Sequence, residues 1–502
     1  MKKLFILLFV FSLQLFASLS SAQDKAQDIY DHAGSLEERT EYKAAEQTYL
    51  DAHSAFMDLG ETDQAYRSLL DARQMHRITL QYPYTEEEAV KMLNESYPYV
   101  SEEISSWIAA GKADFLQAGG AKLYFEDLVK NIAFRDIPLI RKASAIKEQG
   151  DPFFDGARNI IFRLPEPGDT SAFGLHFTHP IEFMAESSLI IPREKLPQEG
   201  LLKLWVPMPI ETSAQSDVRV VSISPEKYLK IPLKKDADIG IAYFEIDLNG
   251  LKEDVNISTQ TVFTRYEEHL VIDPSDISEY DTGSPLYKRY TRSQKNIPVD
   301  ETFRKKALEI TGKEKDPYLA AKKIYDHILD NVRYSFMPHV TLAALDVPEP
   351  VFVMKNSFGD CGAQSMYFSS LCRALGIPAR ACGGMQLFPG AEGDHFWAEF
   401  YLPNYGWIPV DTTIAESSDW TDRITDEERR IYKDFYFGNL DPYRLVIQND
   451  VDAPLYPAPE EKLIISCAIQ EPAVVCVTCA DDLAENMDKY WKIKVSPVEK
   501  EL

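Results

Sequence analysis

Basic residues are scarce in this 502-residue chain: 53 lysines and arginines stand against 79 aspartates and glutamates, for a formal net charge of −26. This charge repels phosphate backbones and anionic lipid, so nucleic acid is not an expected partner. After residue 17 the sequence lacks any long apolar run, which excludes a protein that crosses the membrane several times. Hydrophobic residues still make up 45% of the chain and aromatics 12%, which excludes a disordered protein.

The long apolar stretch that is present lies at the N-terminus. Lys2 and Lys3 precede an apolar run over residues 4–17, and small residues up to Ala22 come before polar Gln23. This layout is typical of a cleavable secretory signal, with cleavage expected after Ala22. An uncleaved anchor is the alternative, but the run is shorter than the roughly 20 residues of a spanning helix. We therefore expect a secreted or periplasmic protein with no membrane span after signal cleavage.

The first part of the mature chain has helical periodicity. Apolar residues recur at three- and four-residue steps from Tyr42 to Ala52 and from Ala65 to Ala72, with a break at 60–63. This predicts an antiparallel helical pair. A weak echo between the two stretches leaves a helical repeat array as an alternative, but a bundle is favoured. Such a helical domain is the expected place for a protein partner to bind.

Short β-branched runs follow, separated by proline, glycine and asparagine, which predicts a β-sandwich. His176 and His179 in this region have the look of a metal-binding pair, but residues i and i+3 point to opposite faces of a regular strand. We therefore expect no metal and no cofactor. The predicted strands are 188–191, 202–206, 218–223, 239–246 and 259–263.

Cys361 lies where a helix is expected to begin. The segment from Cys361 to residue 375 has an apolar side at helical spacing, and Gly376 and Pro378 are placed to end it. The free N–H groups of a helix N-terminus favour a thiolate, the nucleophilic form of cysteine. Because free cysteine is often a small buried hydrophobic residue, this position alone is weak evidence for catalysis.

A histidine and an aspartate follow on a predicted hairpin. His395 is 34 residues after Cys361, and Asp411 is 16 residues further on. If the strands pair symmetrically about Pro403, His395 lies opposite Asp411 with their Cβ atoms about 5 Å apart. The carboxylate would fix the imidazole tautomer and leave the other ring nitrogen for the cysteine. A merely stabilising His–Asp pair is the alternative, but the three residues together favour a catalytic triad.

Four segments carry a resemblance to a known family: Gly359–Ser365 (GDCGAQS), Leu371–Arg380 (LCRALGIPAR), His395–Pro403 (HFWAEFYLP) and Tyr405–Thr412 (YGWIPVDT). They resemble the transglutaminase-like superfamily, whose α+β fold is similar to that of papain-type cysteine proteases. The resemblance implies that Cys361 is the nucleophile, His395 the general base and Asp411 its orienting partner. It also makes Tyr334 the nearest candidate for a side chain that stabilises the oxyanion.

This resemblance implies an exported cysteine hydrolase that cleaves amide bonds in a protein or peptide through a thioacyl intermediate. Two alternatives remain open. The same triad can transfer the acyl group to an amine, which would cross-link proteins. Alternatively, the chain is a surface protein that binds a partner through its helical domain and carries a triad without catalytic activity.

The remaining cysteines predict one disulfide. The stretches around residues 470–473 have the pattern of a hairpin in which Cys467 and Cys476 are directly opposed. With a two-residue loop they form a non-hydrogen-bonded pair, whose Cα spacing of about 4.5 Å is at the short end of the disulfide range. An oxidising compartment favours the bond. Buried free thiols are the favoured alternative to this bond, and Cys479 is a competitor for Cys467.

Together these patterns predict a multidomain α+β protein. Its expected segments are a signal peptide (1–22), a helical domain (23–150), a β-sandwich domain (165–285), a transglutaminase-like α+β domain (296–435) and a C-terminal β extension (436–502).

Overall fold

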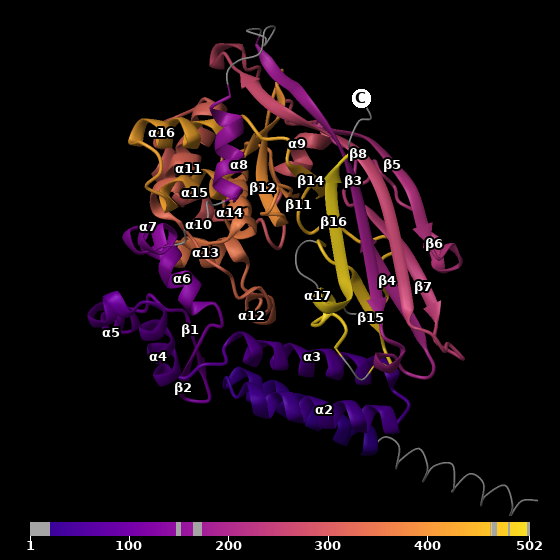
Figure 1. Cartoon of the computed structure of the whole chain (residues 1–502). Coiled ribbons are helices and arrows are strands. Elements are labelled where there is room, and N and C mark those ends of the chain that lie inside the picture. Colours follow the sequence, from indigo (N-terminus) through magenta and orange to yellow (C-terminus); the bar gives the residue numbers. More distant parts are fainter. Residues whose placement is uncertain are drawn as a thin grey trace, which may run out of the picture. The chain divides into compact units, whose positions relative to one another are not determined.

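The computed structural model describes residues 21–146, 152–163, 173–461, 463, 469–479 and 482–498. The chain divides into two compact units (Figure 1). Unit 1 comprises Met1–Val129, Val340–Leu345 and Pro459–Ile464, and unit 2 comprises the rest. The predicted signal peptide lies outside the described residues except for its last two positions, so its cleavage stays a prediction.

Unit 1 is mainly helical. The expected pair is formed by α2 (Tyr42–Asp58) and α3 (Thr62–Gln81), and Gly60 between them takes a positive φ of 74° that suits glycine. The buried residues of α2 follow the predicted stripe and continue it to Phe56. A short hairpin that the helical pattern did not predict comes later in the unit. The other elements are α4 (Glu86–Ser96), η1 (Pro98–Val100), α5 (Ser101–Ala109), β1 (Phe115–Ala118) and β2 (Ala121–Tyr124).

Three further helices stand before the first long strand: α6 (Leu128–Arg135), α7 (Ile137–Ile146) and α8 (Pro152–Ile161). From Lys130 onward these helices belong to unit 2. The helical domain expected over 23–150 therefore does not pack as one body. Helical periodicity is local and does not indicate which core a helix joins.

Two antiparallel four-stranded sheets form the sandwich of unit 2, with strand orders β15-β4-β7-β6 and β16-β3-β8-β5. Their inner faces enclose a core of apolar residues such as Leu189, Leu204 and Phe244. The predicted strands exist, but two of them are much longer than expected. The elements are β3 (Gly174–Ile191), η2 (Arg193–Lys195), β4 (Leu201–Pro207), β5 (Gln215–Ser224), η3 (Glu226–Tyr228), β6 (Leu229–Ile231), β7 (Ile241–Asp247), β8 (Val255–Val271) and η4 (Pro274–Asp276).

The second part of unit 2 surrounds a helix, α14, that packs on a four-stranded sheet of order β13-β12-β11-β14. Asp316 caps α11 by accepting from the N–H groups of Tyr318 and Leu319, and Pro317 is the first residue of this helix. The elements are α9 (Pro285–Tyr290), α10 (Glu301–Thr311), α11 (Pro317–Asn331), β9 (Arg333–Tyr334), α13 (Glu349–Asn356), β10 (Phe358–Gly359), α14 (Cys361–Ala374), β11 (Ala379–Gln386), β12 (Gly393–Leu402), β13 (Gly406–Val410), α15 (Thr412–Ser417), η5 (Ser418–Trp420), α16 (Asp426–Phe435) and β14 (Arg444–Gln448). After its first residue, α12 (His339–Ala344) belongs to unit 1.

The C-terminal segment contains strands, as expected, but they do not form a layer of their own. β14 pairs with β11, β15 (Ala473–Cys476) with β4, and β16 (Trp491–Pro497) with β3. Between the last two strands lies α17 (Met487–Tyr490). The end of the chain therefore completes both the sandwich and the sheet beneath α14.

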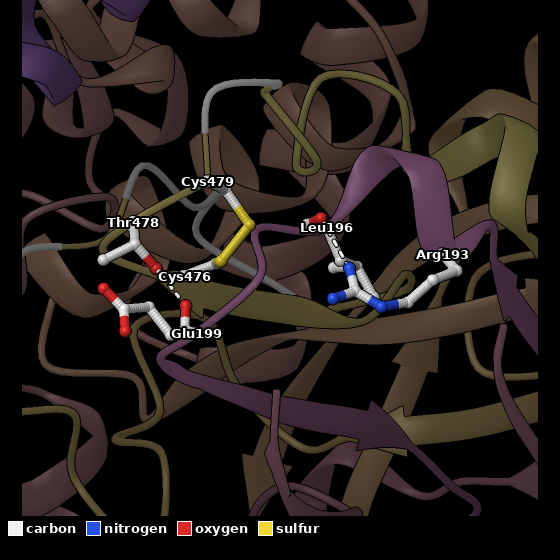
Figure 2. The surroundings of a disulfide bond; sticks show 6 residues. All are labelled: Arg193, Leu196, Glu199, Cys476, Thr478 and Cys479. Atoms are coloured by element: carbon white, nitrogen blue, oxygen red, sulfur yellow. Dashed lines mark hydrogen bonds between the residues drawn. A yellow bond between two sulfur atoms is a disulfide. The ribbon is translucent and has the colours of Figure 1, made fainter. Parts of the chain in front are cut away.

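The predicted disulfide between Cys467 and Cys476 is wrong, because Cys476 is bonded to Cys479 (Figure 2). β15 pairs with β4 across the sandwich, which places Cys476 opposite Leu202. A turn then brings Cys479 back to a Cα distance of 5.3 Å from Cys476. Next to it, the Thr478 hydroxyl donates to the Glu199 carbonyl at 3.1 Å. Cys467 lies outside the described residues.

Breaking this disulfide should lower stability modestly. The bond closes a loop of four residues, for which chain entropy gives about 2 kcal/mol. Both cysteines are buried in the sandwich core, so reduction of the wild type is a cleaner change than replacement of the side chains. We expect reductant to lower the thermal unfolding midpoint by a few degrees in calorimetry. The Cys476→Ala/Cys479→Ala variant should not respond to reductant, and an unchanged wild-type midpoint would contradict the expectation.

Candidate active site

Cys361 is the first residue of α14, as predicted. Asp360 caps the helix by accepting from the N–H of Ala363 at 2.9 Å. Every later residue of α14 is buried, whereas Cys361 itself is half-buried and packs against Phe396 of β12. The helix thus holds the sulfur at its N-terminal end, beside the strand that carries His395.

His395 and Asp411 are in contact. His395 Nε2 lies 2.8 Å from Asp411 Oδ2, and only 4% and 1% of the two residues are exposed. Because Nε2 contacts the carboxylate, Nδ1 is the ring nitrogen that remains to accept a proton from a thiol. The structure therefore brings together the histidine and aspartate that the hairpin predicted.

The predicted strand register that led to this pair is wrong by two residues. Glu399 lies opposite Pro409 and Leu402 opposite Gly406, so the hairpin is centred on Asn404 rather than on Pro403. Asn404 has a positive φ of 74°, which sets this turn. Asp411 follows the end of β13 and caps α15 by accepting from Ile414 N–H at 3.0 Å. A shift of two keeps its side chain on the face of His395.

Tyr334, the candidate for stabilising the oxyanion, lies on β9 next to the strand that leads into Cys361. β9 pairs with β10, which places Tyr334 beside Gly359, two residues before Cys361. Its ring packs among three aromatic rings, with centroid distances of 5.0 Å to Phe134, 5.6 Å to Trp420 and 5.8 Å to Phe336. A role for Tyr334 at the oxyanion stays a prediction.

Comparison with known proteins places this region in a family. The sequence model of the transglutaminase-like superfamily matches residues 304–412, a span that includes Cys361, His395 and Asp411. Residues 304–412 form a transglutaminase-like domain. A protein of Haemophilus influenzae described as uncharacterised is 25% identical over 317 residues, which are 56% of this chain and 82% of the relative.

Two solved structures are similar to the chain at low identity. One, described as a proposed cysteine protease of Cytophaga hutchinsonii, has 14% identity and a TM-score of 0.40, over 65% of this chain and 94% of its own. The other is the periplasmic domain of TgpA from Pseudomonas aeruginosa, with 14% identity and a TM-score of 0.24, over 56% of this chain and 96% of its own. These scores are too low to support a conclusion about function. Over the described part of the chain, no helix is long and apolar enough to cross a membrane.

Arg444 is a residue of the transglutaminase-like site that sequence reasoning missed. It lies on β14 and is fully buried, with Nη1 2.6 Å from Asp411 Oδ2 and Nη2 2.6 Å from Asp441 Oδ2. Burial opposes ionisation of Asp411, but the charges of His395 and Arg444 outweigh it and hold the pKa of that carboxyl well below its usual range. A charged arginine at the start of an apolar strand is the sequence feature that points to a buried ion pair. The sequence, however, predicts that residues 436–502 form a separate extension.

The thiol of Cys361 does not have the low pKa that the helix N-terminus predicted. Burial is the largest influence and raises its pKa well above the usual value, and the nearby carboxylates of Asp360 and Asp411 raise it further. Hydrogen bonds from the N–H groups of Phe396 and Gly362 act in the opposite direction. Cys361 is therefore a thiol in this state, and a thiolate requires transfer of its proton to a base.

A second histidine lies beside the nucleophile position. His339 Nε2 is 2.8 Å from Asp360 Oδ2, and its Nδ1 is 2.6 Å from Glu349 Oε1. Burial disfavours the charged ring, but the two carboxylates outweigh burial and raise the pKa of His339 well above its usual value. The imidazolium thus offsets the negative charge of Asp360, the residue next to Cys361.

Glu416 is a buried carboxyl of α15 that contacts β9 and α14, the helix that begins at Cys361. It accepts from the N–H of Tyr334 at 2.9 Å and from the side chain of Gln364 at 3.3 Å. Burial raises its pKa to about 7, although both hydrogen bonds and Arg333 favour the charged form. Glu416 is thus partly protonated at neutral pH.

Replacing Arg444 should impair both the site and the stability of the fold. We expect Arg444→Met to lower kcat roughly 100-fold with little change in KM, because Asp411 would lose the charge that holds it ionised. It should also lower stability by about 3–5 kcal/mol, because it leaves carboxylates buried without a cation. Arg444→Lys should restore part of kcat. These constants are measured by steady-state kinetics on folded protein.

The matched control is Arg380→Met. Arg380 is buried and pairs with Glu399 in the same sheet at 2.5 Å, but it makes no contact with Asp411 among the interactions of the described residues. This variant should lose stability and keep kcat. Equal kcat values in the Arg444→Met and Arg380→Met variants would contradict a positioning role.

Glu416 should make stability depend on pH. Its pKa is higher in the folded state than in the unfolded chain, so the folded state retains the proton while the unfolded chain loses it as pH rises from about 4.5 to 7. Across that range this carboxyl therefore removes about 3 kcal/mol of stability. In thermal unfolding, Glu416→Gln should lose less stability than wild type between pH 5 and pH 8. The exposed control Glu301→Gln should follow wild type, and parallel profiles for all three proteins would refute the expectation.

Proposed function

We propose that this chain is an exported cysteine hydrolase that cleaves amide bonds of a protein or peptide through a thioacyl-enzyme intermediate. Cys361 is the nucleophile, His395 the general base and Asp411 the residue that orients His395. The observation that carries the proposal is the buried contact of 2.8 Å between His395 and Asp411, on the strand against which Cys361 packs. Nδ1 of His395 is thereby kept available for the thiol.

The proposed reaction begins with transfer of the Cys361 proton to His395 Nδ1 as the sulfur attacks the amide carbonyl carbon. The carbonyl oxygen becomes an oxyanion, for which the backbone N–H of Cys361 is a donor. The imidazolium then gives its proton to the amine nitrogen, the C–N bond breaks, and a thioester remains. Water, deprotonated by His395, attacks the thioester and releases the acid and the thiol.

The charges around the triad suit this sequence of steps. Asp411 stays ionised at working pH, so it stabilises the imidazolium that forms in both halves of the reaction. The raised pKa of Cys361 means that its sulfur is a thiol in the resting state, rather than the thiolate of a preformed ion pair. His395 therefore has to accept the proton of the thiol. Replacement of His395 should lower turnover as severely as replacement of Cys361.

Variants of the triad test the proposal. Cys361→Ala and Cys361→Ser should have no measurable turnover, and Asp411→Asn should lower turnover by roughly 10⁴-fold with the fold intact. Cys372→Ala is the matched control, since Cys372 is a buried free thiol on the same helix and should be dispensable. Turnover is measured on fluorescently labelled casein and on a glutamine-containing peptide. Full activity of Cys361→Ala would refute the mechanism.

The same assay, with a fluorescent primary amine added, shows whether water or an amine accepts the acyl group. Release of acid with no incorporation of the amine is expected for a hydrolase, whereas incorporation would establish the acyl-transfer alternative.

Iodoacetamide labelling tests, without any substrate, whether the triad has lost its catalytic activity. At pH 7, His395→Ala should label more slowly at Cys361 than wild type, because the base is lost. Equal labelling rates would favour a binding protein, for which unit 1 is the proposed partner surface.

A further inference from the structure

Two histidines and a glutamate, none of them a residue of the proposed triad, meet on two neighbouring strands of the sandwich. The ligand atoms of His179, Glu267 and His269 all lie within 4.8 Å of one another. His179 comes from β3, and the other two residues come from β8, its antiparallel neighbour. Two imidazoles and one carboxylate form a ligand set that divalent zinc takes in proteins.

A bulge in β3 places His179 in this group. Thr178 lies opposite Glu267 and Ile181 opposite Arg265, so two residues of β3 stand against a single residue of β8. His179 also has a positive φ of 47°. Such a bulge turns a side chain away from its regular face. The i and i+3 argument that excluded a metal from the sequence assumed a regular strand, and the bulge removes that assumption.

Glu267 is the centre of the cluster. It has no exposed surface, and its Oε1 lies 2.6 Å from His269 Nε2. Its Oε2 lies 3.4 Å from His179 Nδ1. Each oxygen of this carboxylate therefore faces a ring nitrogen of one histidine, so Glu267 links the two imidazoles.

A cation already occupies one side of this carboxylate. Arg163 Nη2 lies 2.7 Å from Glu267 Oε2 and 3.2 Å from His179 Nδ1. The Arg163 side chain is one-third exposed, those of His179 and His269 are 28% and 36% exposed, and solvent can therefore reach the cluster. A divalent ion here would have to displace the guanidinium, which has room to move outward.

We propose that His179, Glu267 and His269 bind a divalent zinc-type metal ion, with water in the fourth position and Arg163 displaced. Ligand atoms at about 2.0–2.1 Å from a tetrahedral ion are about 3.4 Å apart, which is the separation of His179 Nδ1 and Glu267 Oε2. His269 Nε2 must move back from its hydrogen bond, a small rotation for a side chain at the surface. The metal joins β3 to β8 and is structural.

Zinc binding is tested by titration calorimetry on the full chain without a polyhistidine tag. The Cys361→Ala background removes the thiol of the proposed triad, because cysteine sulfur in general is able to bind zinc. We expect one ion per chain, and binding at least tenfold weaker in His179→Ala and in Glu267→Gln. Arg163→Met should bind zinc more tightly, because the competing cation is gone. Cobalt in place of zinc should give the visible absorption of a tetrahedral site.

His76→Ala is the matched control, because His76 is a surface histidine with one carboxylate, Glu46, at 3.1 Å. It should bind zinc like the parent. Thermal unfolding without metal verifies that each variant folds. No bound zinc in the parent, or equal affinity in the parent and His179→Ala, would overturn the proposal.

Discussion

The candidate active site depends on one buried cation. Arg444 lies between Asp411 and Asp441, with a contact of 2.6 Å to each. Two carboxylates this close in a dry interior cannot both stay ionised without a positive charge between them. Removal of Arg444 would leave Asp411 to be neutralised by a proton, and a neutral carboxyl cannot stabilise an imidazolium. The orientation of His395 thus rests on a residue from a strand that follows the matched family segment.

The same balance of charge extends around Cys361. His339 offsets Asp360 on one side, and Arg444 offsets Asp411 on the other. Glu416, in contrast, contacts an amide side chain and a backbone N–H, and its pKa is raised to about 7. The N–H groups of Phe396 and Gly362 favour a thiolate at Cys361, but burial of the sulfur outweighs them. Activation by transfer of a proton follows from that arrangement.

Local features were predictable from the sequence, and long-range pairings were not. The caps of α11 and α14, the buried stripe of α2 and the closeness of His395 and Asp411 depend on neighbouring residues, so periodicity and turn residues were enough. Arg444 and Cys476 depend on which distant strand their own strand joins. β14 joins β11 and β15 joins β4, and neither choice leaves a mark in the spacing of residues. The fold class was therefore predictable, whereas the ion pair between Arg444 and Asp411 was not.

Two irregularities show why some register errors matter and others do not. The hairpin of β12 and β13 is displaced by two residues from the symmetric expectation, and side chains alternate with a period of two, so His395 and Asp411 still share a face. At the bulge of β3 the displacement is by one residue, so Thr178 and Ile181 share a face, whereas residues three apart lie on opposite faces of a regular strand. His179 consequently reaches Glu267, although a regular strand would have turned it away. The parity of an irregularity, more than its size, decides which chemical groups meet.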